Sequence, residues 1–411
     1  MNSQSKNAWF AVCLCAFGLP LLAANLGAGQ IPARIPANAF RPVELWLDDQ
    51  GQHINAHGGG VLPCDGLFYW FGEHKVAGKL GNTAQVGVHV YSSANLYTWK
   101  DEGIALAVSS DPTSEITRGC ILERPKVIFN PGTRKFVMWF HLELKGDGYH
   151  GARSGVAVAD RVTGPYRYLY SLRPNAGVWP DNLPREERRR LSPEEQAQLL
   201  KYHFTGGPPT PMPFPGNLLC QRDFQGGQMA RDMTLFVDED GTAYHIYSSE
   251  ENGTLHISRL ADDFLKPTGR YVRVLVGQFN EAPAVFKKGN KYFLFASGTT
   301  GWVPNPGRVF SADAIWGPWT CLGNPCRGTD AQNQTTFESQ PTYVLQVPGH
   351  AGQFIFMADR WRPKNPIDGR YVWLPIRFDH SAPVLEWKES WTLDIFDAQA
   401  MAERPKTALN Q

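Results

Sequence analysis

The chain has 411 residues, of which 42 % are hydrophobic and 12 % aromatic, and it contains 13 Trp, 40 Gly and 31 Pro. Its 40 Lys and Arg balance its 39 Asp and Glu, so the net charge of +1 gives no electrostatic reason to bind nucleic acid or an anionic membrane. A neutral chain rich in tryptophan and turn residues suits sugars as ligands, because apolar sugar faces stack on aromatic rings.

The first predicted element is an export signal over residues 1–28. Lys6 precedes an apolar run over residues 8–24 that ends in small residues. As a permanent membrane span this run is marginal in length, and Pro20 interrupts it. We therefore expect the mature protein, residues 29–411, to be periplasmic or secreted and to leave the membrane after signal cleavage.

The cysteines give a weak disulfide signal. Two of the seven lie inside the export signal, and the mature chain keeps five, an odd number that leaves at least one thiol unpaired within the chain. Cys321 and Cys326 are the pair that we expect to bond, since only a short loop separates them. The sequence has no Cys-x-x-Cys spacing, so no structural zinc site is predicted.

From residue 57 onward, one short unit recurs five times. Each unit has a polar leading residue, a turn glycine eight or nine positions later, and an aromatic-rich run such as FYWF or FVMWF. The leading residues are His57, Glu123, Asp232, Glu281 and Gln340. Strand–turn–strand repeats of this kind are typical of propeller blades. The sequence therefore predicts an all-β, five-bladed β-propeller whose leading side chains converge on one axis.

Turn motifs support the same blades. Residues 130–132, 238–241 and 288–290 each separate two strand-like runs, as in β-hairpins. Several units end in a turn followed by an aromatic residue, as in Gly-Pro-Tyr at 164–166 and Gly-Pro-Trp at 317–319. We expect these aromatic side chains to pack between neighbouring blades.

One interval between leading residues is longer than the others. Glu123 and Asp232 are 109 positions apart, whereas the other intervals are 49 to 66 positions. An insertion is therefore predicted over residues 170–228, between blades two and three. Its residues 184–203 have a helix-like pattern with the helix-start signature Ser-Pro-Glu-Glu at 192–195. We expect the insertion to decorate the mouth of the site and not to form a separate domain.

Three of the five leading residues are carboxylic acids, which suits glycoside hydrolysis. That reaction needs one acid to protonate the leaving oxygen and a second group to handle the nucleophile. Glu281 is the predicted general acid, because its small and apolar neighbours should raise the pKa of its carboxyl group. Asp232 follows Arg231 and is expected to stay ionised, where it tunes Glu281 or holds the sugar. Glu123 is predicted to bind sugar hydroxyls or to orient the attacking water.

Seven short motifs together resemble glycoside hydrolase family 43. They are NAHGGG at 55–60, WFGE at 70–73, LERPKV at 122–127, RDMTLF at 231–236, NEAP at 280–283, ESQ at 338–340 and DRW at 359–361. The resemblance covers residues 53–396 apart from the insertion. It is greatest to the branch of exo-acting galactanases and galactofuranosidases. It implies a five-bladed propeller and hydrolysis with inversion at the anomeric carbon.

The resemblance also implies roles for the leading residues. Glu281 matches the family's general acid, and Asp232 matches its pKa-modulating aspartate. The wider family has a general-base aspartate in the first blade, where this chain has His57. The galactan-cleaving branch shares this departure, and there a glutamine matching Gln340 has been proposed to assist the water as an imidic acid. Glu123 is the competing candidate for this role.

Further residues are predicted to contact the sugar, by resemblance and because they pair aromatic with polar groups. The predicted contacts are His57, Glu73, Trp302, Asp359, Arg360, Trp361, Tyr371 and Trp373. A hydrogen bond to backbone near the axis is an equal alternative for His57. Some relatives hold calcium in the axial channel near a histidine, a place that Gln340 takes here, so neither a metal nor a cofactor is predicted.

These observations predict an exported glycoside hydrolase that releases terminal β-linked galactose, furanose or pyranose, from oligo- or polysaccharide. An α-L-arabinofuranosidase of the same fold is one alternative. A catalytically silent sugar-binding propeller is another, which the missing first-blade aspartate favours. A protein-interaction propeller is a third, although a site mouth rich in acids and rings speaks against it.

Overall fold

The computed structural model describes residues 38–202, 217–347 and 349–397. The predicted export signal, residues 1–28, lies outside these ranges. In the described part of the chain, no helix is long and apolar enough to cross a membrane.

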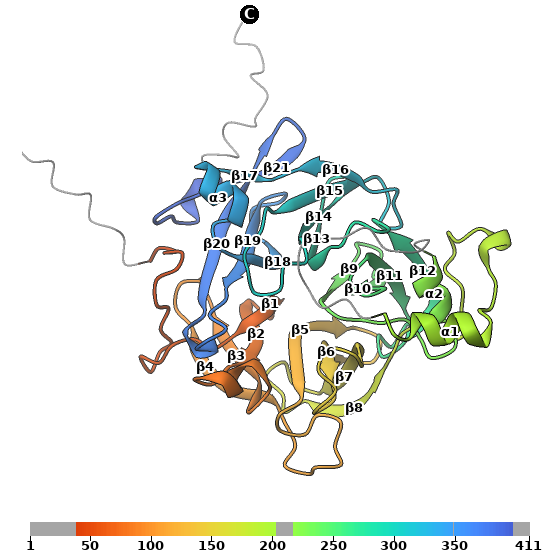
Figure 1. Cartoon of the computed structure of the whole chain (residues 1–411). Helices are drawn as coiled ribbons and strands as arrows, with labels where there is room; N and C mark the ends of the chain where they lie inside the picture. Colours follow the sequence, from red (N-terminus) through yellow and green to blue (C-terminus); the bar gives the residue numbers. More distant parts are fainter. Residues whose placement is uncertain (1–37, 203–216, 348, 398–411) are drawn as a thin grey trace, which may run out of the picture. The chain divides into compact units, whose positions relative to one another are not determined.

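The described residues form five sheets, each built mainly of antiparallel strands in chain order (Figure 1). The first sheet contains β1 (His57–Cys64), β2 (Leu67–His74), β3 (Gly87–Ser93) and β4 (Lys100–Ala107). The second contains β5 (Ile121–Asn130), β6 (Lys135–Glu143), β7 (Arg153–Ala159) and β8 (Arg167–Leu172). The third contains β9 (Met233–Val237), β10 (Ala243–Ser249), β11 (Thr254–Leu260) and β12 (Pro267–Val274).

The last two sheets follow the same pattern. The fourth contains β13 (Glu281–Lys288), β14 (Lys291–Ser297), β15 (Arg308–Ala312) and β16 (Thr320–Gly323). The fifth contains β18 (Gln340–Gln346), β19 (Phe354–Arg360), β20 (Arg370–Asp379) and β21 (Ala382–Glu386), and β17 (Cys326–Arg327) adds a parallel edge.

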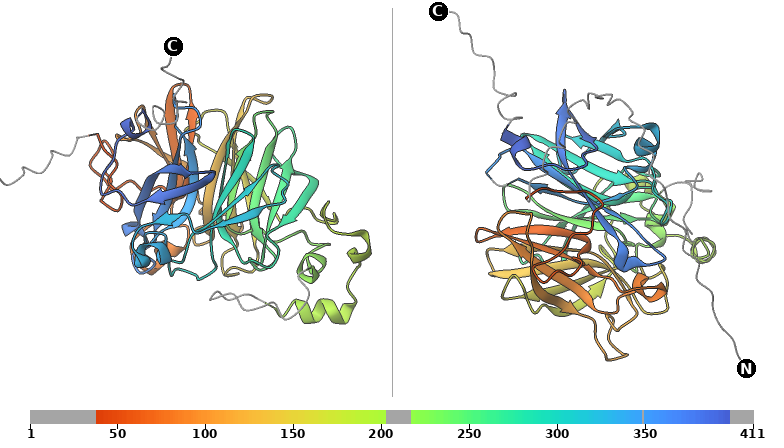
Figure 2. Two further views of the ribbon diagram at one scale, coloured as in Figure 1. Left: turned by 90° about the horizontal axis from the view of Figure 1, so that it is seen from above. Right: turned by 90° about the vertical axis from the view of Figure 1, so that its left-hand side faces the viewer.

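The first strands of the sheets meet in a closed ring. Strand β1 contacts β5, β5 contacts β9, β9 contacts β13, β13 contacts β18, and β18 returns to β1. Figure 1 looks along the axis of this ring, and Figure 2 shows the sheets side by side around it. The predicted five-bladed β-propeller is therefore confirmed, and the five repeated units are its blades.

Five hydrophobic cores lie between neighbouring blades. Alternate residues of a strand point to opposite faces, so Phe136 and Met138 pack toward the first blade while Val137 and Trp139 pack toward the third. Both faces of each inner hairpin are buried in this way. This explains why the repeated runs are almost wholly apolar, because a propeller blade has no solvated face near the axis.

The predicted packing of the outer aromatic residues is also confirmed. Trp99 and Tyr166 are buried in the cores on either side of the first blade, and Trp319 packs against the core between blades three and four. A bridge between Phe40 and Trp391 brings the start and end of the described chain together beside the first and fifth blades.

The insertion runs between β8 and β9, so it begins three residues after the predicted position. It holds a short 3₁₀ turn η2 (Arg185–Glu187) and two helices, α1 (Pro193–Leu199) and α2 (Leu218–Arg222), drawn beside β12 in Figure 1. The predicted helix start is confirmed, because Ser192 and Glu195 form a reciprocal capping box with Pro193 at the first helical position. Three further short helices are η1 (Lys79–Asn82), α3 (Asp330–Thr335) and η3 (Pro366–Asp368).

The expected disulfide is not formed. Cys321 is exposed on β16, Cys326 is buried in β17, and both are free thiols, as are the three other cysteines of the described chain. The two residues lie on strands of different blades, so their closeness in sequence does not bring them together as a loop would.

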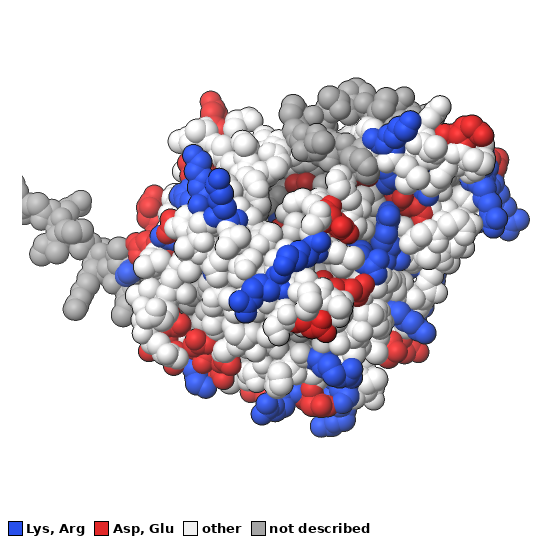
Figure 3. Space-filling model, turned by 60° about the horizontal axis from the view of Figure 1, so that its bottom comes forward, with Lys and Arg blue, Asp and Glu red and all other residues white. Residues whose placement is uncertain are grey.

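Charged side chains of both signs are interspersed on the face shown in Figure 3. This distribution agrees with the net charge of +1. No broad surface of a single sign is visible on that face.

Candidate active site

The leading residues lie at or next to the start of the inner strands, and a β-bulge follows three of them. The register shifts between His57 and Gly60, between Glu123 and Lys126, and between Glu281 and Ala284. In each case the next residue has a positive φ, 62° at Gly58, 57° at Arg124 and 54° at Ala282. Bulges bend a strand and re-aim its side chains. The repeat in sequence is thus also a repeat of local backbone geometry at the axis.

A cavity of about 470 Å³ opens over the leading residues. Seven predicted residues line it: Glu73, Glu123, Asp232, Glu281, Trp302, Gln340 and Trp361. Seven residues without an assigned role complete it: Lys75, Arg124, Tyr149, His150, Arg231, Asn252 and Gly301. The structure therefore brings the predicted acids and two predicted rings together in one place.

Glu281 has the properties of an acid that stays protonated at neutral pH. Burial first, and then the negative charge of Asp232, raise the pKa of Glu281 to about 8. Arg124 and Arg231 act in the opposite direction but do not outweigh these effects. The side-chain amide of Asn252 donates a hydrogen bond of 2.8 Å to Oε1 of Glu281. The sequence predicted this raised pKa from the apolar neighbours, and the structure adds the charge of Asp232 as a second cause.

Asp232 is held in a fixed orientation beside Glu281. Nε and Nη2 of Arg124 donate to its two carboxylate oxygens at 3.1 and 2.9 Å. The backbone N–H of Ala282 donates to Oδ2 at 3.0 Å. The partner of Asp232 is thus Arg124 from the second blade, and not the adjacent Arg231. Arg124 likewise does not pair with its neighbour Glu123, as adjacency in sequence would suggest.

Glu123 is an ionised carboxylate of the second blade that also lines the cavity. Tyr149 donates a hydrogen bond of 2.8 Å to Oε1, and Nδ1 of His141 lies 3.3 Å from Oε2. Burial alone would raise the pKa of Glu123, but His141, Lys75 and Tyr149 lower it to about 2. Burial likewise opposes the charged form of His141, yet Glu123 and Glu143 raise the pKa of His141 to about 9. His141 therefore carries a positive charge that stabilises Glu123.

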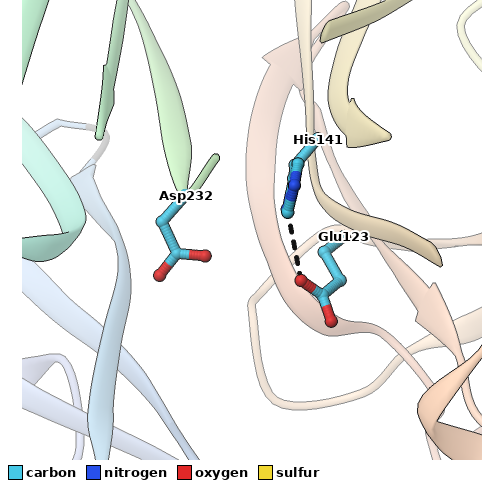
Figure 4. A group of neighbouring side chains, drawn as sticks. All are labelled: Glu123, His141 and Asp232. Atoms are coloured by element: carbon cyan, nitrogen blue, oxygen red, sulfur yellow. Dashed lines mark ion pairs between the residues drawn. The ribbon is translucent and has the colours of Figure 1, made fainter. Parts of the chain in front are cut away.

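Glu123, His141 and Asp232 form the kind of group that can bind a metal ion. One ligand atom from each residue lies within 4.8 Å of the other two (Figure 4). However, Asp232 is bound by Arg124 on both oxygens, and His141 holds two protons at neutral pH. A cation would have to displace a proton from His141 and face the guanidinium group of Arg124. The two carboxylates of this group are therefore already neutralised by Arg124 and His141, an arrangement that does not favour a metal ion.

Both the amide oxygen and the amide nitrogen of Gln340 form hydrogen bonds to other side chains around the cavity. Its Oε1 accepts from Nη2 of Arg124 at 2.5 Å and from Nε1 of Trp361 at 2.8 Å. Its Nε2 donates to Oγ of Ser297 at 2.9 Å. In this arrangement the amide orients Arg124 and Trp361, and the amide oxygen has both lone pairs engaged.

The remaining predicted wall residues combine charge with aromatic surface. Glu73 accepts from the backbone N–H of Arg124 at 3.0 Å and pairs with Lys75 at 2.5 Å. Burial, as the first cause, raises the pKa of Glu73. Trp302 is 40 % exposed and meets Trp361 edge-on, with ring centroids 5.8 Å apart. An exposed ring beside a polar cavity is well placed to pack on a sugar face.

His57 does not reach the cavity, so its predicted substrate contact is wrong. Its side chain is fully buried and neither ring nitrogen has a hydrogen-bond partner. The ring stacks on Tyr371 at 5.3 Å, and Gly369 packs so closely that a Cβ there would lie 2.6 Å from Cε1 of His57. Burial lowers the pKa of His57 well below its ordinary value. The alternative prediction, a backbone hydrogen bond, is not met either.

Four other predicted contacts also lie outside the cavity. Tyr371 and Trp373 are buried in the core between the fifth and first blades, because both face the same side of β20. Asp359 is buried and accepts from the backbone N–H of Gly58 at 2.5 Å. Arg360 lines an adjacent cavity, where it pairs with Glu338 at 3.2 Å. Tyr371, Trp373 and Asp359 thus belong to the buried interior and not to the cavity wall.

The sequence contains partial signals for the residues that were missed. Arg124 stands in the LERPKV motif, but its partner across the axis is not adjacent in sequence. Tyr149 and Asn252 lie in polar loops after β6 and β10. Loops of this kind carry no periodic pattern, so no sequence signal assigns these two residues to the cavity.

The described residues of the insertion do not line the cavity, which differs from the expected place at its mouth. They reach it indirectly, because Arg222 of α2 pairs with Glu251, the neighbour of Asn252.

Comparisons with known proteins agree with this site. The model of glycosyl hydrolases family 43 matches residues 214–362. A solved family 43 β-1,3-galactosidase with galactodeoxynojirimycin is 49 % identical, with a TM-score of 0.80, and the match covers 86 % of this chain and all of that one. A search of curated proteins found no match.

Two exo-β-1,3-galactanases are more distant. The enzyme from Phanerochaete chrysosporium, in a complex of a variant with β-1,3-galactotriose, is 30 % identical with a TM-score of 0.68, covering 87 % of this chain and 68 % of that one. The enzyme from Clostridium thermocellum is 30 % identical with a TM-score of 0.68, covering 86 % of this chain and 66 % of that one. From the propeller, the cavity and these similarities it follows that the chain belongs to glycosyl hydrolases family 43 and is a glycoside hydrolase.

Proposed function

We propose that this enzyme is an exo-acting, inverting glycosidase that releases terminal β-linked galactose, with Glu281 as the general acid. The observation that carries the proposal is the position of Glu281, with its pKa raised to about 8, beside the Arg124-bound Asp232. Similar solved structures are named as β-1,3-galactosidases and exo-β-1,3-galactanases. Those names support galactose as the sugar and β-1,3 as the linkage.

Protonation of the leaving oxygen is the task proposed for Glu281. At neutral pH its carboxyl group holds a proton and can pass it to the glycosidic oxygen as the bond breaks. The charge that then develops on Glu281 meets Arg124 and Arg231, which both favour the ionised form. Asp232 keeps the proton on Glu281 before the reaction by repelling a second negative charge.

Activation of the attacking water is the task that we propose for Glu123. It is the wall carboxylate with a pKa lowered to about 2, so it is ionised and can accept a hydrogen bond from a water. His141 and Tyr149 fix its two oxygens. A low pKa makes it a weak base, but an inverting enzyme needs the base only as the bond to the water forms.

Gln340 suits a positioning role better than a basic one. An imidic-acid form would place a proton on Oε1, which already faces the guanidinium group of Arg124. It would also remove a proton from Nε2, which donates to Ser297. Both changes oppose the existing hydrogen bonds, so we assign to Gln340 the orientation of Arg124 and Trp361.

The substrate is tested by product analysis. Purified enzyme is incubated with β-1,3-galactan and with p-nitrophenyl β-galactopyranoside, β-galactofuranoside and α-L-arabinofuranoside, and the products are followed by chromatography and anomeric-proton NMR. We expect galactose to appear first as the α-anomer. Release of arabinose alone would instead identify an α-L-arabinofuranosidase. No release, with binding of galacto-oligosaccharide by calorimetry, would identify a sugar-binding propeller.

The base is tested by comparing Glu123→Gln with Gln340→Leu. If Glu123 accepts the proton of the water, external azide should restore activity to Glu123→Gln and give an azido sugar, since a small anion needs no base. Gln340→Leu should keep measurable activity without azide. The reverse pattern would assign the base to Gln340.

Export is a separate proposal, which rests on the apolar run over residues 8–24. Expression with the full N-terminus should give a periplasmic or secreted protein that begins near residue 29. A cytoplasmic protein with an intact N-terminus would contradict it.

A further inference from the structure

A strained turn stands beside the proposed acid. Glu250, Glu251 and Asn252 connect β10 to β11, and their φ angles are 52°, 57° and 62°. Residues with a Cβ adopt this left-handed conformation only at a cost in free energy, and they usually do so singly. Three in succession persist only where surrounding contacts hold them.

The first residue of the turn is fixed by the third blade itself. Oε1 of Glu250 accepts from His256 at 2.8 Å, and Oε2 accepts from Thr254 at 2.9 Å and from Nη2 of Arg273 at 2.7 Å. Glu250, Thr254 and His256 are fully buried. This end of the turn is therefore anchored by β11 and β12.

The second residue is fixed by the insertion. Glu251 is 1 % exposed, and its Oε1 accepts from Nη1 of Arg222 at 3.1 Å. Its Oε2 accepts from Nη2 of Arg231 at 2.9 Å. Arg222 comes from α2 and is itself held by Asp223 through two hydrogen bonds of 2.8 Å. A buried charged group thus joins the insertion, the turn and the wall of the cavity.

The third residue points at the acid. Asn252 is 7 % exposed, and its Nδ2 donates to Oε1 of Glu281 at 2.8 Å. When Glu281 is protonated, an oxygen that accepts from an amide N–H is the carbonyl oxygen, so the proton resides on Oε2. Asn252 therefore decides which oxygen of Glu281 carries the proton for the substrate.

We propose that Arg222 of the insertion is a positioning residue for catalysis, because through Glu251 it holds the left-handed turn that aims Asn252 at Glu281. The insertion would then serve proton transfer without lining the cavity. This inference rests on the proposed role of Glu281 as general acid. Arg222 does not line the cavity, so its effect has to pass through Glu251, which is joined both to Asn252 in the turn and to Arg231.

The charges that face Glu281 come from several elements. Asp232 and Arg231 precede β9, and Arg124 belongs to β5. The other titratable groups of the cavity wall are Glu73, Lys75, Glu123, Tyr149 and His150. Arg222 is separated from Glu281 by Glu251 and Asn252, so a variant of Arg222 leaves these charges in place.

Two variants separate the steps of the inference. Asn252→Gly removes the amide but keeps a residue that tolerates positive φ. Arg222→Met removes the insertion's contact with Glu251. In both variants we expect kcat for phenyl β-galactopyranoside to fall about tenfold or more, because a misaligned Glu281 transfers its proton less well. KM should stay nearly unchanged. Dinitrophenyl β-galactopyranoside should lose much less, because its leaving group needs little protonation.

The pH profile and a double variant give a second readout. The Asn252 hydrogen bond favours the ionised form of Glu281, so its loss should move the alkaline limb of kcat/KM to higher pH. If Arg222 acts through Asn252, adding Arg222→Met to Asn252→Gly should cause no further loss. Arg189→Met is the matched control, since Arg189 lies in the same insertion but pairs with Glu195 on the surface.

The outcomes distinguish this inference from the proposed function. If Glu281→Gln depends strongly on the leaving group while Asn252→Gly and Arg222→Met do not, Glu281 is the acid and the positioning role is wrong. If Glu281→Gln shows no such dependence, the acid assignment itself fails. Should Arg222→Met not fold, the leaving-group dependence and pH profile of Asn252→Gly decide, and a profile equal to wild type would overturn the inference.

Discussion

His57 and Glu281 occupy the same place in blades one and four, yet only Glu281 reaches the cavity. Each begins the inner strand of its blade, and each is followed by a bulge with a positive φ at the next residue. The side chain of His57 is fully buried with no hydrogen-bond partner. Glu281 lines the cavity and bonds to Asn252.

The difference comes from what covers each residue. Gly369 packs against the ring of His57, and a side chain at this position would collide with it. The side chain of Glu281 instead faces the cavity and charged neighbours from two other blades. A repeat therefore fixes where a side chain begins, while contacts from distant segments decide whether it is chemically available.

The largest effect is expected at Glu281, the member of the pair that lines the cavity. Glu281→Gln removes the proposed proton donor while keeping size and hydrogen bonding, so kcat should fall about 10²–10⁴-fold. The thermal midpoint should stay at or above that of the wild type, because a buried acid is replaced by a neutral amide. Steady-state kinetics and a melting curve measure both. Activity close to wild type would remove the central assignment.

The next effect concerns the charge beside Glu281. The proposed acid role requires protonated Glu281, so activity should persist below the pKa of about 8 and decline above it. Asp232→Asn removes the negative charge that helps to raise this pKa, so the alkaline limb of kcat/KM should move down by about one pH unit or more. Asp313→Asn is the control, because Asp313 lies on the surface with its side chain 85 % exposed. An unmoved limb in Asp232→Asn would show that burial alone sets the pKa.

Much of this contrast lies beyond what sequence can predict. The regular offsets located all five leading residues, since the turn glycine and the aromatic run are local features. The burial of His57 depends on Gly369, which is distant in sequence. Tyr371 and Trp373 were misassigned because aromatic residues pack in the blade cores as readily as they line a cavity. Asn252 was missed because its turn is held by charges from three separate segments.

A smaller effect is expected at the buried member. Because the pKa of His57 is lowered in the folded state, the unfolded chain takes up a proton below pH ~6.5 while the folded chain does not. Stability is therefore lost as pH falls below this value, by up to about 1.4 kcal/mol per pH unit. His57→Leu should make the urea midpoint fall less steeply between about pH 6.5 and pH 5.

The control for His57→Leu is His380→Leu, whose side chain is 98 % exposed and should not change the slope. Activity of His57→Leu at neutral pH should remain near that of wild type, because His57 does not line the cavity. Loss of activity in a well-folded His57→Leu would mean that the ring influences the substrate through Asp359, which lies 3.8 Å away.

The smallest effect is expected from metal removal. The other carboxylates near Glu281 already form ion pairs within the protein. Asp232 pairs with Arg124, and Glu123 pairs with His141. Excess EDTA should therefore change neither the rate nor the thermal midpoint, and added Ca²⁺ should not restore an EDTA-treated sample beyond its starting rate. If EDTA lowered the rate and Ca²⁺ restored it, the group of Glu123, His141 and Asp232 would bind a cation. In that case His141 would have to lose a proton on binding, so the affinity for Ca²⁺ would rise with pH up to the pKa of about 9 of that residue.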